Sequence, residues 1–320
     1  MRTFLTEAWA LRVPLIGAPM SPQAGGRLAA AISRAGGLGM IGAGSAVATE
    51  RLLADADECR KAAPGLPFGI GLMSWAVAKR PELLAAAIEA KPFAISLSFG
   101  EIAPHAARVK SAGIELVSQV QDRASALAAE AAGATLIVAQ GTEAGGHTGG
   151  VGTLPLLQVV LESVSAPVVA AGGIASGRGL AAVLAAGAAG AWIGTPFLVS
   201  EEARNNDEQR ARVLGANETD TVLTSLFDLG QRIPWPAQYR GRALKNAFSE
   251  RWLGRESELA QDDQAQRELA EAVRAQSYET AQIYAGQTVG LLDRVEPAAA
   301  IVERITREAE LHLRAASRII

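Results

Sequence analysis

Short apolar runs recur along the first two thirds of the chain, and each is separated from the next by a segment with helical spacing. The runs are continuously apolar and do not alternate with polar residues, which is typical of parallel strands buried on both faces. We therefore predict eight strands, over residues 13–19, 38–43, 67–73, 93–99, 114–120, 135–140, 167–173 and 191–197.

The segments between these runs place apolar residues at the period of a helix, as in GGRLAAAISRAGG and RPELLAAAIEAKP. Several of them end in glycine, which is a common helix stop. Eight alternating strand–helix units predict an α/β protein with a closed (β/α)8 TIM barrel. An open doubly wound sheet would share most of this pattern, but the count of eight favours the barrel.

The chain changes in character after the eighth predicted strand. Residues 205–295 are richer in charge, lack a strand-like run and contain the amphipathic pattern SERWLGRESELAQDDQAQRELAEAVRAQ. We predict a smaller helical domain or lid over 205–295, and a barrel domain made of residues 1–204 and 296–320. Pro297 is compatible with a helix start, and the final segment is expected to pack on the barrel.

One stretch, residues 179–200, carries no charge and is longer than the roughly 18 apolar residues that indicate a membrane-spanning helix. Gly187, Gly190 and Pro196 divide it into a helix-length piece, a strand-length piece and a turn. Glu7 and Arg12 interrupt the apolar core that a signal peptide would need. We therefore expect no membrane partner and a cytoplasmic protein.

The composition narrows the classes of function. Hydrophobic residues make up 49% of the chain but aromatic residues only 5%, so small and branched aliphatic side chains must fill the core. The net charge of -3 and the scattered Lys and Arg residues argue against nucleic acid as a partner. The single cysteine, Cys59, rules out an internal disulfide and a cysteine-based metal cage.

Two glycine-rich stretches resemble nucleotide-binding loops. Gly37, Gly39 and Gly42 match G-x-G-x-x-G, but a predicted helix precedes them and a strand begins among them, so a tight turn explains them better than a dinucleotide site. The stretch PVVAAGGIASGRG (167–179) has the opposite order, because its glycines follow a strand and lead into a helix. Bare N–H groups and the positive helix end there suit a phosphate.

A second loop supports the phosphate site. The eighth predicted strand ends in Gly194 and Thr195, which offer a bare amide and a hydroxyl. In a TIM barrel the loops after strands seven and eight frequently bind phosphate. Ordinary turn chemistry is the alternative, and the agreement of two loops favours the phosphate site.

The stretch AQGTEAGGHTGG (139–150) follows the sixth predicted strand, on the same rim. Gln140 and Glu143 could hydrogen-bond a polar ring, and the glycines let a flat ligand approach the main chain. His147 would then lie beside that ligand. A lone histidine is more often structural, but this setting favours catalysis for His147 and not for His105 or His312. No second metal ligand is near in the sequence, so no metal is expected.

Five stretches are informative together: APM (18–20), AGGLG (35–39), AQGTEAGGHTG (139–149), AAGGIASGRG (170–179) and IGTPF (193–197). They resemble the nitronate monooxygenases, formerly called 2-nitropropane dioxygenases. The most specific piece is AQG-x-EAGGH. The wider group also includes NAD(P)H-dependent quinone reductases and flavin-dependent enoyl-acyl-carrier-protein reductases, which look similar.

The resemblance implies a barrel that holds FMN without a covalent bond, with His147 as the catalytic histidine. It implies flavin contacts near the ends of several strands and phosphate contacts in the two glycine loops. With Glu143 of the 139–150 stretch included, the expected cofactor-binding residues are Ala18, Pro19, Met20, Gly71, Gln119, Gln140, Gly145, Gly172, Gly173, Gly194 and Thr195.

Three positions depart from the family pattern. Gly71 stands where many members have Asn, Thr148 where many have Arg, and Ser176 where Asp is common. FMN binding remains compatible with these changes. Gly71 and Thr148 are expected to border the pocket and to enlarge it, which leaves the substrate open.

The leading hypothesis is an FMN-dependent nitronate monooxygenase that oxidises alkyl nitronates with dioxygen to carbonyl compounds and nitrite. A neutral imidazole, with an ordinary pKa near 6.5, can accept the acidic α-proton of a nitroalkane. The alternatives are an NAD(P)H-dependent flavin reductase acting on a quinone or an enoyl thioester, and a non-catalytic flavin-binding protein. The expected partners are a small-molecule substrate and dioxygen, and a second copy of the chain in a homodimer.

Overall fold

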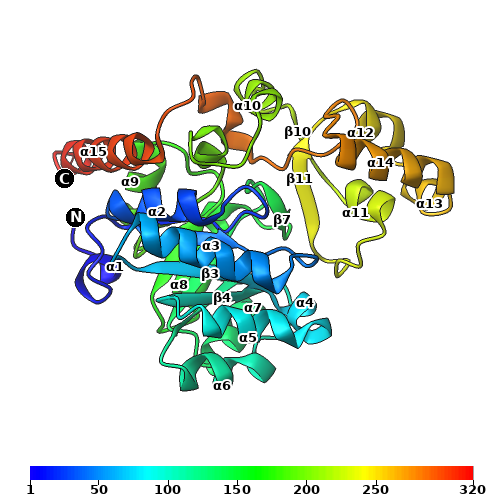
Figure 1. Cartoon of the computed structure of the whole chain (residues 1–320). Coiled ribbons are helices and arrows are strands. Elements are labelled where there is room, and N and C mark those ends of the chain that lie inside the picture. The colour runs from blue at the N-terminus through cyan, green and yellow to red at the C-terminus, as the bar shows by residue number, and fades with distance from the viewer. Residues whose placement is uncertain (320) are drawn as a thin grey trace.

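The structure, a computed structural model that describes residues 1–319, confirms the predicted (β/α)8 TIM barrel (Figure 1). Eight parallel strands lie in the order β1-β9-β8-β6-β5-β4-β3-β2, and a bridge between Ile16 and Leu38 closes the ring. Each predicted run contains one strand. The barrel strands are β1 (Leu15–Gly17), β2 (Gly39–Gly42), β3 (Phe68–Met73), β4 (Ala94–Ser98), β5 (Glu115–Val120), β6 (Leu136–Gln140), β8 (Val168–Ala171) and β9 (Ala191–Ile193).

Helices connect the strands and cover the outside of the barrel. They form where apolar residues recur at helical spacing, and α5 begins at a proline in its first position, where the missing N–H is not needed. The helices of this part are α1 (Phe4–Glu7), α2 (Gly26–Arg34), α3 (Thr49–Ala62), α4 (Ser74–Lys79), α5 (Pro81–Glu89), α6 (Ala103–Ser111), α7 (Arg123–Ala131), α8 (Thr153–Leu161) and α9 (Gly177–Ala185).

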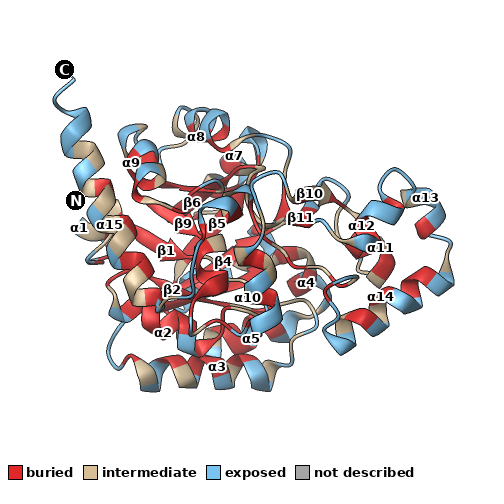
Figure 2. Cartoon of the chain, turned by 90° about the horizontal axis from the view of Figure 1, so that it is seen from above, coloured by how far each residue is buried: buried red, intermediate tan, exposed pale blue. Residues whose placement is uncertain are grey.

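Both faces of the barrel strands are buried (Figure 2). One set of side chains packs together in the interior and includes Met40, Val117, Val138 and Trp192. The alternating set packs against the surrounding helices, as Ile41, Leu116 and Ile137 do. This double burial is the physical reason for the largely apolar runs in the sequence. The filled interior leaves the rim of the barrel as the place for a site.

Residues 205–295 contain helices, as predicted, but the prediction that they lack strands is wrong. Two short strands, β10 (Thr221–Thr224) and β11 (Arg240–Leu244), form an antiparallel sheet with β7 (Gly146–Thr148) from the rim of the barrel. Strands of four and five residues are too short to give a clear periodic signal, and β11 also carries two arginines. The helical elements here are α10 (Asp207–Leu214), α11 (Leu226–Gln231), α12 (Ala247–Trp252), α13 (Glu256–Leu259), α14 (Asp263–Ala275) and the 3₁₀ helix η2 (Gln287–Leu291).

The last helix, α15 (Ala298–Ala316), returns to the barrel and packs against α9 and α2. Its buried residues Ile301, Val302 and Ile305 join the layer between strands and helices. The uncharged stretch 179–200 is divided among α9, β9 and the 3₁₀ helix η1 (Thr195–Val199), as the glycines and the proline predicted. Within the described residues no helix combines the length and the apolar character that crossing a bilayer requires.

Candidate active site

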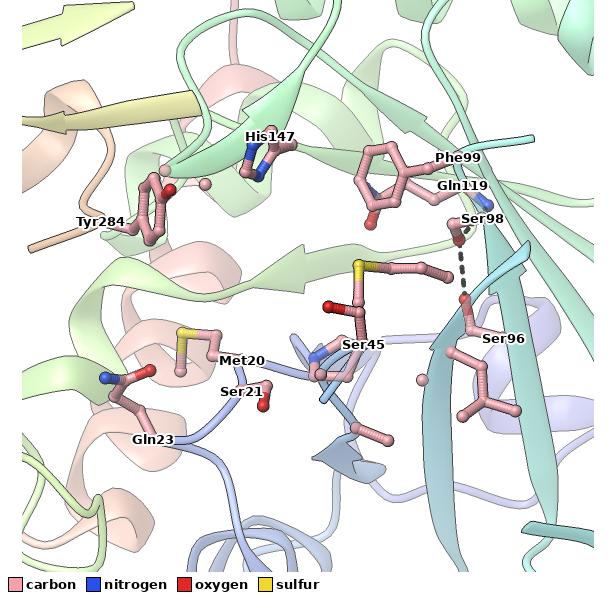
Figure 3. A pocket seen from close by; sticks show the side chains of 18 of the residues that line it. Met20, Ser21, Gln23, Ser45, Ser96, Ser98, Phe99, Gln119, His147 and Tyr284 are labelled. Carbon is pink, nitrogen blue, oxygen red and sulfur yellow. Dashed lines mark hydrogen bonds between the residues drawn. The ribbon is translucent and has the colours of Figure 1, made fainter. Parts of the chain in front are cut away.

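A cavity of about 300 Å³ opens at the carboxyl ends of the barrel strands, between the barrel rim and the segment inserted after β9. Figure 3 shows His147 and Tyr284 on one side of this cavity and Met20, Ser21 and Gln23 on the other. The carboxyl ends of the strands are where TIM barrels carry their active sites. The insertion contributes Asp228, Ile233, Trp235, Gln282 and Tyr284 to the wall.

A smaller cavity of about 50 Å³ adjoins the first and is lined by Gly172, Gly173, Gly194 and Thr195, which we call the glycine cradle. Gly172 and Gly173 have φ angles of 95° and 68°, in the region that favours glycine. Within residues 1–319 the backbone N–H groups of Gly173 and Gly194 donate to no protein acceptor. None of the described residues that line this cavity carries a charged side chain. Free backbone donors of this kind suit a phosphate group.

Most of the predicted cofactor-binding residues come together around these two cavities. Gln119, Gln140, Gly145 and Thr195 line both. The larger cavity also contains Pro19, Met20 and Gly71. Ala18 lines neither cavity and lies behind the cradle, where its N–H donates to the Ile193 carbonyl.

Glu143 lies behind the cradle and lines neither cavity. Its carboxylate accepts hydrogen bonds from the N–H and the hydroxyl of Thr153, at 2.9 Å and 2.8 Å. Thr153 is the first residue of α8, whose N-cap is Gly152 and supplies no side-chain acceptor. The carboxylate therefore caps α8, because the unpaired N–H groups at a helix start favour a negative acceptor.

Gln140 is held by protein partners although it lines both cavities. Its amide nitrogen donates to the His147 carbonyl at 3.0 Å, and its amide oxygen accepts from Gln121 at 2.8 Å. All three residues are buried. Gln140 thus fixes the main chain of β7 relative to the barrel, in addition to its place in the wall of the cavity.

His147 lies in a cluster of side chains that the insertion completes. Its Nε2 lies 2.8 Å from Oδ2 of Asp228 in α11, and its ring stacks on Trp235 with centroids 3.5 Å apart and planes 8° apart. The ring centroid of Tyr284 lies 5.5 Å from that of the imidazole. We call His147, Asp228, Trp235 and Tyr284 the histidine cluster. The antiparallel pairing of His147 with Gly241 of β11 fixes the position of β7, the strand that carries the imidazole.

The ionisable side chains of the histidine cluster are shielded from solvent. His147 is 8% exposed and Asp228 is 4% exposed. Burial, and secondly the charge of Asp228, raise the pKa of Tyr284 well above its ordinary value. Tyr284 is therefore a neutral phenol at physiological pH. Among the described residues no lysine or arginine lines the larger cavity, and His147 is the basic side chain in its wall.

Gly71 borders the larger cavity, as expected, whereas Thr148 does not, and neither residue enlarges it. A Cβ atom on Gly71 would overlap the ring of Pro19, so this proline already fills the space that a side chain would take. Thr148 follows His147 in β7 and points the other way, as successive residues of a strand do. Its hydroxyl donates to the Gly141 carbonyl at 3.0 Å, and the residue is buried away from the cavity.

The sequence patterns missed Asp228, Trp235 and Tyr284. Asp228 and Tyr284 are separated from His147 by long stretches of chain and carry no local motif. One signal was available, because Trp235 lies between Pro234 and Pro236 in a polar loop. A large aromatic residue in such a loop has no helix or strand face to fill, which is typical of a residue at a binding site.

The other two histidines lie outside both cavities, His105 in α6 and His312 in α15. Desolvation, and secondly Arg108, lower the pKa of His105. Across residues 1–319 no three His, Cys, Asp or Glu side chains gather closely enough to hold a metal ion.

Known proteins resemble this chain over nearly its whole length. Residues 2–308 match the family model described as nitronate monooxygenase. A dehydrogenase of Mycobacterium tuberculosis named for a 5-hydroxy-7a-methyl-1-oxo-octahydro-1H-indene-4-carboxyl-CoA is 32% identical, with 100% of this chain and 99% of the relative covered.

Two solved structures share the fold and part of the sequence. FabK from Thermotoga maritima has a TM-score of 0.89 at 30% identity, with 100% of both chains covered. The nitroalkane oxidase of Streptomyces ansochromogenes has a TM-score of 0.82 at 28% identity, with 98% of this chain and 99% of that chain covered. The resemblance seen in AQGTEAGGHTG thus extends across the barrel and the insertion. The chain is an oxidoreductase and belongs to the nitronate monooxygenase family.

Proposed function

We propose that this chain is an FMN-dependent nitronate monooxygenase. The glycine cradle would hold the phosphate through backbone N–H groups and the Thr195 hydroxyl, and Gln119 and Gly145 would border the ring. The cradle suits the phosphate of FMN because its wall offers free backbone N–H donors. Among the described residues no positively charged side chain lines it. The flavin would supply electron transfer between the substrate and dioxygen.

One observation carries the proposal: His147 faces the same cavity that adjoins the cradle. A neutral imidazole there can take the α-proton of a nitroalkane, and the resulting imidazolium stabilises the nitronate anion. The described residues that line the cavity include no lysine or arginine, so His147 is the side chain that can stabilise the negative charge of the nitronate. Proton transfer by a positioned side chain contributes roughly 10²- to 10⁴-fold to a rate.

The competing candidate is the reduction or oxidation of an acyl thioester. It is supported by the carboxyl-CoA named in the M. tuberculosis relative, which aligns over 100% of this chain. A carbon next to a thioester carbonyl is also acidic, so His147 could act on it in the same way. The nitronate reaction is favoured because the family model that matches residues 2–308 is described as nitronate monooxygenase.

The first experiment separates these reactions with the purified protein. FMN should be released on denaturation, and oxygen uptake with nitrite formation should follow the addition of ethylnitronate in air. Mixing with NADH or NADPH without oxygen should leave the oxidised flavin spectrum unchanged. Rapid bleaching by either nucleotide would overturn the monooxygenase in favour of a reductase, and a protein that cannot be loaded with FMN would overturn both.

The second experiment tests the base. The His147→Asn variant should lose roughly 10²- to 10⁴-fold in kcat/KM with neutral nitroethane and much less with ethylnitronate, which is already deprotonated. His105→Asn and His312→Asn serve as matched controls outside the cavities and should keep wild-type rates with both compounds. An equal loss with both compounds would assign His147 a role other than proton abstraction. Full activity of His147→Asn would support a binding protein or another base.

Three further features belong to the proposal. The barrel, residues 1–204 with 296–320, forms the cofactor domain, and 205–295 forms a smaller domain that covers the substrate. The protein acts in the cytoplasm, as a homodimer. Size-exclusion chromatography with light scattering measures directly whether the protein is a dimer.

A further inference from the structure

Asp228 is a buried carboxylate that the reaction proposed above does not yet use. It lies at the third position of α11, where its neighbours Leu226 and Phe227 are fully buried. Phe227 packs on Phe248 with ring centroids 5.8 Å apart, in the core of the insertion. This packing fixes the main chain at Asp228, so its carboxylate is a rigid partner for the imidazole.

The contact between Asp228 and His147 determines where the imidazole carries its proton. A neutral imidazole has one N–H group, and a carboxylate can only accept a hydrogen bond. The 2.8 Å distance joins Oδ2 of Asp228 to Nε2 of His147, so the proton of the neutral ring belongs on Nε2. The other nitrogen, Nδ1, then has a free lone pair, and within the described residues it has no hydrogen-bond partner.

The rest of the histidine cluster prevents the ring from turning. Trp235 stacks on one face of the imidazole at 3.5 Å. Gly241 of β11 lets this strand lie close to the imidazole and to Tyr284. A Cβ atom at this position would lie 3.5 Å from Nε2 of His147 and 2.8 Å from the Tyr284 ring. The stack, the strand and the carboxylate therefore hold the ring in one orientation in the cavity wall.

Few ionisable side chains surround the pair. The second carboxylate oxygen, Oδ1 of Asp228, is buried and has no hydrogen-bond partner among the described residues. Of the residues that line the cavity, His147, Asp228 and Tyr284 carry ionisable side chains, and Tyr284 stays neutral because its pKa is raised. Among the described residues that line the cavity, Asp228 is therefore the carboxylate that contacts the imidazole.

We propose that Asp228 is a positioning residue that holds His147 in the Nε2–H form, so that Nδ1 is the atom that takes the substrate proton. The inference rests on the proposed role of His147 as a base. A carboxylate in this place also stabilises the imidazolium after the proton has moved from the substrate carbon to Nδ1.

The test uses the full chain with FMN bound and ¹⁵N-labelled histidine. Three histidines give three imidazole signals, and the signal lost in His147→Asn assigns the one of interest. The wild type should show the Nε2–H form of His147. Asp228→Asn, which keeps the shape of the side chain and removes the charge, should lose this preference because an amide can either donate or accept.

Kinetics supply the second readout. Asp228→Asn should lower kcat with nitroethane about 100-fold, since the ring no longer keeps one tautomer, and leave KM within about twofold. Asp55→Asn is the matched control, because Asp55 is also a buried carboxylate but pairs with Arg204 on the barrel. It should leave both the His147 signal and kcat unchanged.

Two outcomes would overturn the inference: an Nδ1–H form of His147 in the wild type, or an unchanged His147 signal in Asp228→Asn. The wild-type spectrum decides the first even if the variant fails to fold. A His147→Asn variant that turns over nitroethane normally would refute the proposed base, while an observed Nε2–H form would still support the role of Asp228 in setting the tautomer.

Discussion

The glycine cradle and the histidine cluster border one another but are built in different ways. The cradle uses backbone from the two loops that follow β8 and β9. The histidine cluster uses side chains from β7 and from an insertion of the chain, and Asp228 is 81 residues from His147. Backbone donors in a loop depend on a few neighbouring residues, whereas a side-chain cluster depends on the pairing of β7 with β11.

This difference predicts different responses to substitution. In the cradle a single added carbon changes the shape of the main chain itself. In the histidine cluster a substitution removes one contact and leaves the scaffold in place. The expected effects decrease from the cradle to the stacked tryptophan and then to Tyr284.

The largest effect is expected in the cradle. Gly172→Ala places a Cβ atom 2.9 Å from the Thr153 hydroxyl and 3.0 Å from the Gly141 carbonyl, at a φ of 95°. We expect a loss of about 3 kcal/mol in the free energy of unfolding from strain and overlap together. Urea unfolding of the FMN-free protein measures it.

Gly173→Ala is the matched control for Gly172→Ala. Its φ of 68° lies in the left-handed region that other residues can enter, and its Cβ would meet Glu143 at an ordinary 3.6 Å. We expect a loss of about 1 kcal/mol. Equal losses in the two variants would show that the loop is not held by the contacts around Gly172.

A smaller effect is expected from the stacked tryptophan. Trp235→Leu removes the 3.5 Å stack on His147 and the edge contacts with Trp75 and Phe99. Aromatic pairs contribute about 0.5–1.5 kcal/mol beyond their buried area, so kcat/KM should fall about three- to tenfold. Trp252→Leu, in the core of the insertion and away from the cavity, should lower stability without this loss. Equal kinetic losses would argue that the whole insertion is loosened.

The smallest effect at neutral pH is expected from Tyr284→Phe. The pKa of Tyr284 is raised in the folded state, so the phenol stays neutral there while the unfolded chain ionises above about pH 10. Its contribution to stability is present below that pH and is lost as pH rises toward the folded pKa, at about 1.4 kcal/mol per pH unit. The variant should match the wild type at pH 8 and lose less stability at pH 11. Parallel losses in the two proteins would contradict the raised pKa.

Several features of the fold and the site could be predicted from the sequence because their causes are local. Strands buried on both faces are mostly apolar, and this predicted all eight barrel strands. Glycines that follow a strand and precede a helix predicted the loop that carries Gly172 and Gly173 at positive φ. The glycine-rich setting of His147 predicted its place at the rim of the barrel.

Other features follow from pairing between distant parts of the chain. The strand β7 exists because β11 pairs with it, and this pairing turns Thr148 away from the cavity that His147 faces. Glu143 caps α8 because the turn after β6 folds back on that helix. Neither arrangement leaves a periodic pattern in the sequence, because each depends on a contact between separate elements of the fold.

The sequence by itself determined the barrel, the two glycine loops and the histidine between them, because burial and backbone conformation act on neighbouring residues. Only the tertiary structure decided which residues surround that histidine. Asp228, Trp235 and Tyr284 reach His147 because the insertion folds back over the rim, and the 2.8 Å contact that sets its tautomer joins two segments that no local pattern connects.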